Sequence, residues 1–282
     1  MYQKIAIVTG ASSGIGKAFI GLLAGDNGEY FKTPFDEIWA IARRKDALDE
    51  IWAIARREDA LNELASSIKG VRIVPVVADL STDSGIKTVE DKLKAEEPKV
   101  GLLINSAGMG IKGPMADKPA KALGDTISIN CTALSEMINI TVPYMKPEGN
   151  IHSKIINIGS SAGFLPQPGF ACYAASKSYV ISFSRAMSCE LKSKGIDVLV
   201  VCPGPVATDF QRRATEGKEA NFTDWRKNFV VDPVKLAKAT LKASIRGKRM
   251  MSYPFSQKLL HFASKAFPIS WILAFESGAV KE

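Results

Sequence analysis

The chain has 282 residues, 46% of them hydrophobic, and its 37 lysines and arginines against 29 aspartates and glutamates give a formal net charge of +8. This composition is typical of a soluble globular protein and excludes disordered, collagen-like and coiled-coil chains. The length allows one large domain or two small ones.

The cysteines and the apolar stretches further limit the classes of protein to which this chain can belong. Four cysteines stand far apart and only two histidines accompany them, so we expect neither a disulfide framework nor a structural zinc site. The apolar run near the N-terminus is too short for a signal peptide, and no stretch approaches the roughly 20 apolar residues that cross a bilayer. We therefore expect a cytoplasmic protein.

In chain order, short apolar runs alternate with segments whose apolar residues recur at helical spacing. We predict strands over 4–8, one copy of the sequence IWAIARR, 73–77, 100–104, 155–158, 198–201 and 249–252. We predict helices over 15–23, 85–95, 120–144, 173–193 and 234–245, the last with Asp232 as its N-cap. Because strands that are apolar on both faces belong to covered parallel sheets, the pattern predicts an α/β fold with a doubly wound parallel sheet flanked by helices. No linker divides the chain, so we expect a single domain over residues 1–282.

A tandem duplication lies at the predicted second strand. Residues 38–50 (IWAIARRKDALDE) are followed at once by 51–63 (IWAIARREDALNE), identical at 11 of 13 positions. A solenoid needs at least three repeats, so we interpret this one as a local duplication, natural or engineered. Either copy one forms the strand and the extra residues lengthen the next helix, or copy one loops out and copy two forms the strand. We favour the first, because copy one keeps its approach from the first helix.

The positive charge is concentrated in the last quarter of the chain. From Thr208 onward there are 14 lysines and arginines and 7 aspartates and glutamates, a net charge of +7. This excess indicates either a solvated basic surface or attraction to an acidic substrate or an anionic membrane. No nucleic-acid-reading motif accompanies it, so we expect no nucleic-acid partner.

A glycine-rich turn, TGASSGIG at 9–16, lies between the first predicted strand and helix. Glycines there permit a tight turn and let a cofactor pyrophosphate approach the N–H groups of the helix N-terminus. The residues that we expect to contact it are Gly10, Ser12, Ser13, Gly14, Ile15 and Gly16.

Tyr173 and Lys177 stand four residues apart at the start of a predicted helix, so they share a face. A free tyrosine titrates near pH 10, and a neighbouring ammonium lowers its pKa by favouring the phenolate. We therefore expect Lys177 to lower the pKa of Tyr173. Ser160, which precedes Tyr173 by 13 residues, could hydrogen-bond a substrate oxygen.

Taken together, these motifs resemble the short-chain dehydrogenase/reductase family over nearly the whole chain. The matching elements, in the family's order and spacing, are TGASSGIG at 9–16, Asp79-Leu80, NSAG at 105–108, Asn130, Ser160, YAASK at 173–177 and PGPVAT at 203–208. The resemblance implies a single NAD(P)-binding domain of Rossmann type. Ser106 departs from the pattern, since the family more often has a second Asn there.

The resemblance also implies a catalytic role for each of four residues. Tyr173 would be the general acid/base, and Lys177 would lower its pKa and bind the nicotinamide ribose. Ser160 would orient the substrate carbonyl, and Asn130 would hold a water that connects Lys177 to solvent. Hydride would then pass between the nicotinamide and the carbonyl carbon of a small-molecule ketone or alcohol.

Further cofactor contacts follow from the same resemblance. Asp79 would meet the adenine amine, and the residues implied beyond it are Leu80, Asn105, Ala107, Gly108, Pro203, Gly204, Val206 and Thr208. The second strand ends in Arg43 and Arg44, or Arg56 and Arg57 in copy two, with no acid at that point. Because arginine accommodates a ribose 2′-phosphate, both alternatives predict NADP(H).

The substrate loop would be 209–230, and the residues expected to line the pocket before Tyr173 are Phe164, Leu165, Gln167, Phe170 and Cys172. Apolar walls with a basic rim favour a lipophilic ketone with an acidic tail. We expect the C-terminal helical tail, 254–282, to pack on the body or on a subunit partner. The alternative is docking at a membrane surface, which Lys258 and Lys265 favour. Family members commonly form homodimers or homotetramers; the rival function is a non-catalytic NADP(H)-binding regulator.

Overall fold

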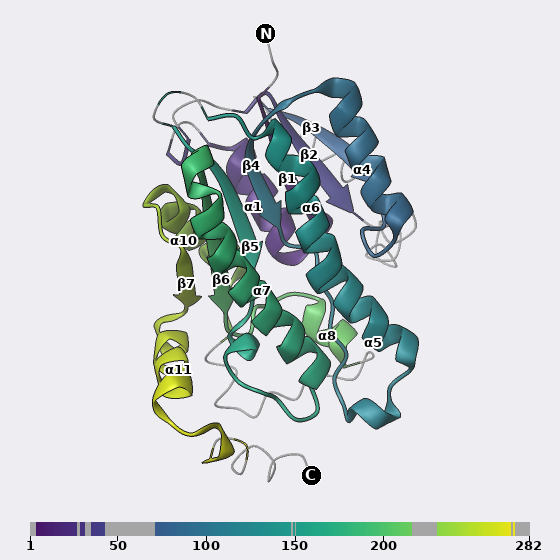
Figure 1. Ribbon diagram of the computed structural model, residues 1–282, viewed down its shortest axis with the longest axis vertical. Coiled ribbons are helices and arrows are strands. Elements are labelled where there is room, and N and C mark those ends of the chain that lie inside the picture. Colours follow the sequence, from purple (N-terminus) through teal and green to yellow (C-terminus); the bar gives the residue numbers. More distant parts are fainter. Residues whose placement is uncertain are drawn as a thin grey trace.

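Seven strands form one parallel sheet in the order β3-β2-β1-β4-β5-β6-β7 (Figure 1). The computed structural model describes residues 4–26, 29–31, 35–42, 71–147, 149, 151–215, 230–271 and 273. The strands are β1 (Lys4–Thr9), β2 (Glu37–Ala42), β3 (Arg72–Val77), β4 (Lys99–Asn105), β5 (Ser153–Ile158), β6 (Ile196–Pro203) and β7 (Met250–Tyr253). The strand order reverses between β1 and β4, which is where doubly wound sheets bind ligands, at the carboxyl ends of the strands.

Helices cover both faces of this sheet, as predicted. They are α1 (Gly14–Ala24), α4 (Asp83–Glu96), α5 (Ala120–Ile127), α6 (Ala133–Thr141), α7 (Ala171–Glu190), α8 (Phe210–Ala214), α10 (Pro233–Ile245) and α11 (Phe255–Ala266). Buried residues of α1 and α10 pack on one face, and those of α4, α6 and α7 pack on the other. Figure 1 shows α6 and α7 in front of the sheet and α1 behind it. The Rossmann-type fold class is confirmed.

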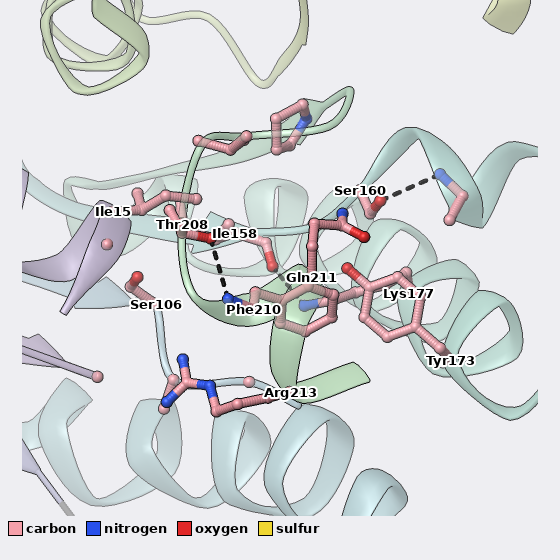
Figure 2. Close-up of a pocket in the computed structure, with 18 of the residues that line it drawn as sticks. Ile15, Ser106, Ile158, Ser160, Tyr173, Lys177, Thr208, Phe210, Gln211 and Arg213 are labelled. Carbon is pink, nitrogen blue, oxygen red and sulfur yellow. Dashed lines mark hydrogen bonds between the residues drawn. The ribbon is translucent and has the colours of Figure 1, made fainter. Parts of the chain in front are cut away.

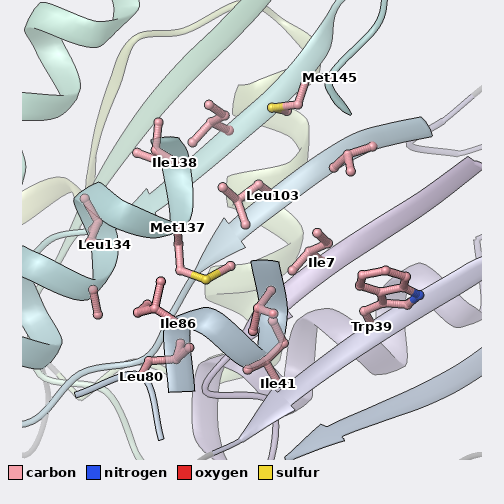
Figure 3. Packing of buried hydrophobic residues seen from close by; sticks show 14 of the residues in the cluster. Ile7, Trp39, Ile41, Leu80, Ile86, Leu103, Leu134, Met137, Ile138 and Met145 are labelled. Atoms are coloured by element: carbon pink, nitrogen blue, oxygen red, sulfur yellow. The ribbon is translucent and has the colours of Figure 1, made fainter. Parts of the chain in front are cut away.

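The alternating direction of side chains along the strands explains why there are two hydrophobic clusters, one on each face of the sheet. In β1, Ile5 and Ile7 join the cluster under α4, α6 and α7, whereas Ala6 and Val8 join the cluster under α1 and α10. Successive strand side chains point to opposite faces, so a strand buried on both faces must be apolar throughout. Figure 3 shows the first of these clusters, from Trp39 across Ile7 and Leu103 to Met137.

Copy one of the duplication forms the second strand, as we favoured, since β2 begins at Glu37 and ends at Ala42. It pairs with β1 and with β3 in parallel register. Residues 43–63, which hold the rest of copy one and all of copy two, lie outside the described residues. The predicted lengthening of the following helix is therefore untested.

The predicted helix over 120–144 is not continuous. A π-helical turn, Ser128–Thr132, separates α5 from α6, and a 3₁₀ turn follows α6. Apolar spacing predicts helix here but does not distinguish the wider π turn from regular α-helix. The interruption contains Asn130, and π turns often occur at functional sites.

Smaller predictions have a direct outcome. Asp232 caps α10, accepting a hydrogen bond from the Lys235 N–H at 2.8 Å, and Pro233 occupies the first turn. All four cysteines are free. In the part of the chain that the structure describes, no helix is both long enough and apolar enough to cross a membrane.

Candidate active site

A pocket of about 690 Å³ opens at the carboxyl ends of the central strands. Its walls come from the turn after β1, the loops after β4, β5 and β6, and the helices α7, α8 and α11. Figure 2 shows Ser160, Tyr173 and Lys177 on one side of this pocket and Ile15 and Ser106 on the other. Motifs that are far apart in the sequence therefore share one cavity.

The glycine-rich turn passes tightly against the loop after β4. Gly10 has a φ of +65°, and a Cβ built on it would lie 2.8 Å from the Ala107 nitrogen. A Cβ on Gly16 would lie 2.3 Å from the Gly10 carbonyl oxygen, so neither position has room for a side chain. Thr9 ties the two segments together, because its Oγ1 accepts hydrogen bonds from the N–H groups of Ser106 and Ala107, both at 3.0 Å. Motif spacing alone does not predict this role for Thr9.

Tyr173 is buried in the first turn of α7, in contact with two aromatic rings. The Phe170 ring stacks on it with a centroid distance of 4.4 Å, and the Phe210 ring from α8 lies at 5.2 Å. Burial raises the pKa of Tyr173 to about 12, and a side-chain hydrogen bond with Ser160 opposes this rise. The phenol is therefore protonated at neutral pH.

Lys177 lies one turn further along α7, also buried. Its Nζ donates a hydrogen bond to the Ile158 carbonyl at 2.9 Å and lies 5.7 Å from the centroid of the Tyr173 ring. Burial lowers the pKa of Lys177 to about 8. An ammonium with so low a pKa can exchange its proton near neutral pH.

The expected lowering of the Tyr173 pKa is not what the structure shows. Although Lys177 lies close to the ring, desolvation of the phenolate is the largest influence on the pKa of Tyr173 and raises it. The prediction counted the charge four residues away and did not count burial, which disfavours the charged form of both side chains.

Ser160 reaches this pair because the turn after β5 packs directly on the backbone of α7. A Cβ on Gly163 would lie 2.6 Å from the Lys177 carbonyl carbon, so the close approach requires glycine. Ser160 caps the 3₁₀ turn Ser161–Phe164, with its Oγ accepting a hydrogen bond from the Ala162 N–H at 3.1 Å. Its hydroxyl hydrogen is not used in that bond, so Ser160 can donate it to the Tyr173 oxygen or to a substrate carbonyl oxygen.

Asn130 lies behind the pocket wall, in the π turn. Its Nδ2 donates to the Met109 carbonyl at 2.8 Å and to the Ser176 Oγ at 2.9 Å, and its Oδ1 accepts from the Met109 N–H at 3.0 Å. The side chain thus holds the loop after β4 against α7. It is not among the residues that line the pocket, and its predicted water-holding role stays a prediction.

Most of the predicted cofactor residues line the pocket. Those that do are Gly10, Ser12, Ser13, Gly14, Ile15, Leu80, Ala107, Gly108, Pro203, Gly204, Val206 and Thr208. Gly16, Asp79 and Asn105 do not, and Arg43 and Arg44 lie outside the described residues. The Asp79 carboxylate accepts hydrogen bonds from the N–H and the hydroxyl of Ser81, at 3.0 and 2.7 Å, which makes it the anchor of a turn.

Only some of the residues that we expected on the substrate side of the pocket do line it. Gln167 and Phe170 line the pocket, but Phe164, Leu165 and Cys172 do not. Phe164 stacks on His261 of α11 at 4.5 Å, and the Cys172 thiol donates to the Leu123 carbonyl at 3.6 Å. A list of residues near Tyr173 in sequence does not reveal which way each one faces.

The predicted substrate loop, 209–230, contributes Gln211 and Arg213 of α8 to the pocket. Pocket residues that were missed, because they come from distant segments, include Lys112 after β4 and Gln257 and Leu260 of α11. The Lys112 N–H donates to the Ala214 carbonyl at 2.8 Å, which joins the loop after β4 to α8. The spacing of these residues gave no signal; only the basic character of the region was visible beforehand.

Comparison with known proteins agrees with this arrangement. A family model described as short chain dehydrogenase matches residues 40–219. The chain is 30% identical over 215 residues to a probable short-chain type dehydrogenase/reductase, VdlC, of Helicobacter pylori, covering 76% of this chain and 69% of that protein. It is also 30% identical over 219 residues to the 3-oxoacyl-[acyl-carrier-protein] reductase FabG of Escherichia coli, covering 78% and 80%.

A solved structure shows the same similarity. A short-chain dehydrogenase from Sphingobium yanoikuyae, in complex with NADPH, superposes with a TM-score of 0.70 at 26% identity, covering 93% of this chain and 94% of that one.

Proposed function

Because the chain belongs to the short-chain dehydrogenase family, we propose that it is an NADP(H)-dependent oxidoreductase that interconverts a carbonyl group and a secondary alcohol. The observation that carries this proposal is the convergence of Ser160, Tyr173 and Lys177 on one pocket. When bound, the nicotinamide would supply or accept the hydride. The protein would bind both molecules, orient them and move the proton.

The glycine-rich turn suits the diphosphate of such a cofactor. Ser13 makes no side-chain cap at the start of α1, and the first turn of the helix holds no acid. Free N–H groups at a helix N-terminus bind phosphate, and the space that a Cβ on Gly10 or Gly16 would fill is already taken by backbone. Lys177 would hold the nicotinamide ribose.

In the reductive direction, Tyr173 would donate its phenolic proton to the carbonyl oxygen while Ser160 donates a hydrogen bond to the same oxygen. A phenol whose pKa is about 12 carries the proton that this step needs. Lys177, with a pKa of about 8, can return a proton toward the phenolate at neutral pH. Asn130 would contribute by holding a water between Lys177 and solvent.

The duplication provides a test of the preference for NADP(H), because each copy carries a pair of arginines that can be substituted separately. Ala42, the last residue of β2, lines the pocket, and Arg43 and Arg44 follow it in the sequence. We expect a preference for NADPH over NADH of more than about tenfold in kcat/KM, since a charged hydrogen bond to phosphate contributes about 1.5–3 kcal/mol. The double variant Arg43→Ala/Arg44→Ala should lose most of it, and the copy-two variant Arg56→Ala/Arg57→Ala should keep it.

These reactions are measured as NADPH or NADH consumption over a panel of ketones, aldehydes, steroids and acyl thioesters. A preference below tenfold in the wild-type protein would reject the cofactor assignment. NADPH binding without turnover of any panel member would indicate the regulator instead.

The substrate that we propose is a lipophilic ketone with an anionic tail. Phe170, Phe210 and Leu260 line the pocket with apolar surface, and Lys112 and Arg213 line it with positive charge. Figure 2 shows Arg213 projecting from α8 within the pocket wall.

We expect an anionic ketone to exceed its neutral methyl ester by about tenfold in kcat/KM, as one charged hydrogen bond would give. Arg213→Gln should reduce this ratio toward one. Arg212→Gln is the matched control, because Arg212 neighbours Arg213 on α8 and does not line the pocket. Equal turnover of the two ketones by the wild-type protein would contradict the proposed substrate class.

We also propose a cytoplasmic homodimer or homotetramer, in keeping with the family. Exposed Ile127 and Tyr179 border a shallow hollow between the π turn and α7, a surface that a second copy would cover.

A further inference from the structure

Helix α11 presents an apolar stripe to solvent. Phe255, Leu259 and Phe262 are 69%, 60% and 72% exposed, and their spacing puts them on one side of the helix. Phe267, Ile269 and Trp271 continue the apolar surface beyond the helix, each more than half exposed. We call these six residues the α11 face. Exposed apolar surface of this extent usually marks an interaction site.

The opposite side of α11 is held by the body of the protein. Gln257 is buried, and Gln257 and Leu260 line the catalytic pocket. The His261 ring stacks on Phe164 with a centroid distance of 4.5 Å. These contacts fix the rotation of the helix, so the α11 face points outward. In Figure 1, α11 lies beyond the carboxyl end of β7, at the lower edge of the molecule.

Positive charge borders the α11 face. Lys258 and Lys265 stand seven residues apart and so lie on the same side of the helix, next to the apolar stripe. The Lys258 Nζ lies 5.4 Å from the centroid of the Phe255 ring. Between 255 and 271 the sequence has these two lysines and no aspartate or glutamate. The surface therefore combines aromatic residues with cations and has no acid of its own to pair them.

We propose that the α11 face, with Lys258 and Lys265, binds the surface of a bilayer that contains anionic lipid. Aromatic and aliphatic side chains would enter the boundary between headgroups and acyl chains, and the lysines would extend to the lipid phosphates. A second copy fits less well, because two α11 faces would bring four lysines together without an acid from either helix.

Docking in this orientation would bring the pocket close to the membrane. The helix that touches lipid on one side supplies Gln257 and Leu260 to the pocket on its other side. If the proposed oxidoreductase activity holds, a lipophilic substrate could then reach the pocket from the bilayer. The docking itself needs no turnover.

The test is cosedimentation of the full-length protein with vesicles, without substrate or cofactor. We expect binding to phosphatidylcholine vesicles with about 30% phosphatidylglycerol, and at least about tenfold weaker binding to pure phosphatidylcholine. Phe255→Ser/Leu259→Ser/Phe262→Ser should weaken binding to both vesicles at least about tenfold. Lys258→Gln/Lys265→Gln should remove only the preference for anionic lipid.

A matched charge control is Lys235→Gln/Lys238→Gln, which removes the same number of charges from exposed positions on another helix, α10, and should leave binding unchanged. Circular dichroism and light scattering on every variant establish folding and mass. Equal binding by wild type and the folded triple serine variant would overturn the proposal. The proposal would also be overturned if the wild-type protein did not bind vesicles and the triple serine variant had a lower mass in solution than the wild type. That result would assign the α11 face to a second copy. Neither result depends on catalysis, so failure here is distinguishable from failure of the proposed function.

Discussion

Tyr173→Phe is expected to lower kcat for ketone reduction by about 10³-fold while NADPH binding changes less than about twofold. The variant removes only the hydroxyl that would protonate the carbonyl oxygen. The ring keeps its stacking on Phe170 and its contact with Phe210, so the fold and the pocket wall should survive. Steady-state NADPH oxidation measures kcat, and NADPH fluorescence titration measures binding.

Tyr179→Phe is the matched control for that variant. Tyr179 lies on the same helix, is partly exposed, and hydrogen-bonds the Ser135 hydroxyl at 2.8 Å outside the catalytic pocket. Tyr179→Phe keeps the ring that a second copy would cover and removes only this hydroxyl, so kcat should stay within about twofold. Turnover by Tyr173→Phe at the wild-type rate would reject Tyr173 as the proton donor.

Lys177→Met is expected to lower kcat by about 10²-fold or more and to change how stability depends on pH. Burial lowers the pKa of Lys177 from 10.5 to about 8. Between these two values the unfolded chain binds more protons than the folded one, so wild-type stability rises with pH in that window. Methionine does not titrate, so the variant lacks this rise.

The size of the effect follows from linkage. The lowered pKa of Lys177 costs the wild type about 3 kcal/mol of stability at about pH 7 and about 1 kcal/mol at about pH 9.5, because one pKa unit corresponds to about 1.4 kcal/mol. Wild type should therefore gain about 2 kcal/mol relative to Lys177→Met between these pH values, measured by urea unfolding. Lys177→Met also loses the hydrogen bond to the Ile158 carbonyl. This loss changes the stability of the variant by the same amount at both pH values, so it cancels in the comparison.

The control for this comparison is Lys87→Met, on the solvent side of α4. Lys87 pairs with Asp91 at 2.9 Å and is largely exposed, so its removal should change stability by less than about 0.5 kcal/mol at either pH. If the difference between wild type and Lys177→Met is the same at both pH values, Lys177 is not titrating in the folded protein near pH 8.

The two variants address the part of the site that sequence spacing predicted least well. The spacing of four positions from Tyr173 to Lys177 correctly put both on one side of α7, since local helix geometry determines that. Spacing did not predict that burial would raise the pKa of the tyrosine and lower that of the lysine, because burial depends on segments elsewhere in the chain.

The order of strands and helices, the capping of α10 by Asp232 and the family were readable in the sequence by itself. Each rests on residues close together in the chain, where apolar period and motif spacing act locally. The π turn that holds Asn130, the facing of Phe164 and Cys172 away from the pocket, and the entry of Lys112 and Gln257 into it were decided only by tertiary structure. The same is true of the α11 face, since the sequence left open whether this tail packs on the body, on a subunit partner or at a membrane surface. Which side of a helix is covered depends on the elements that pack against it, and those elements come from distant parts of the chain.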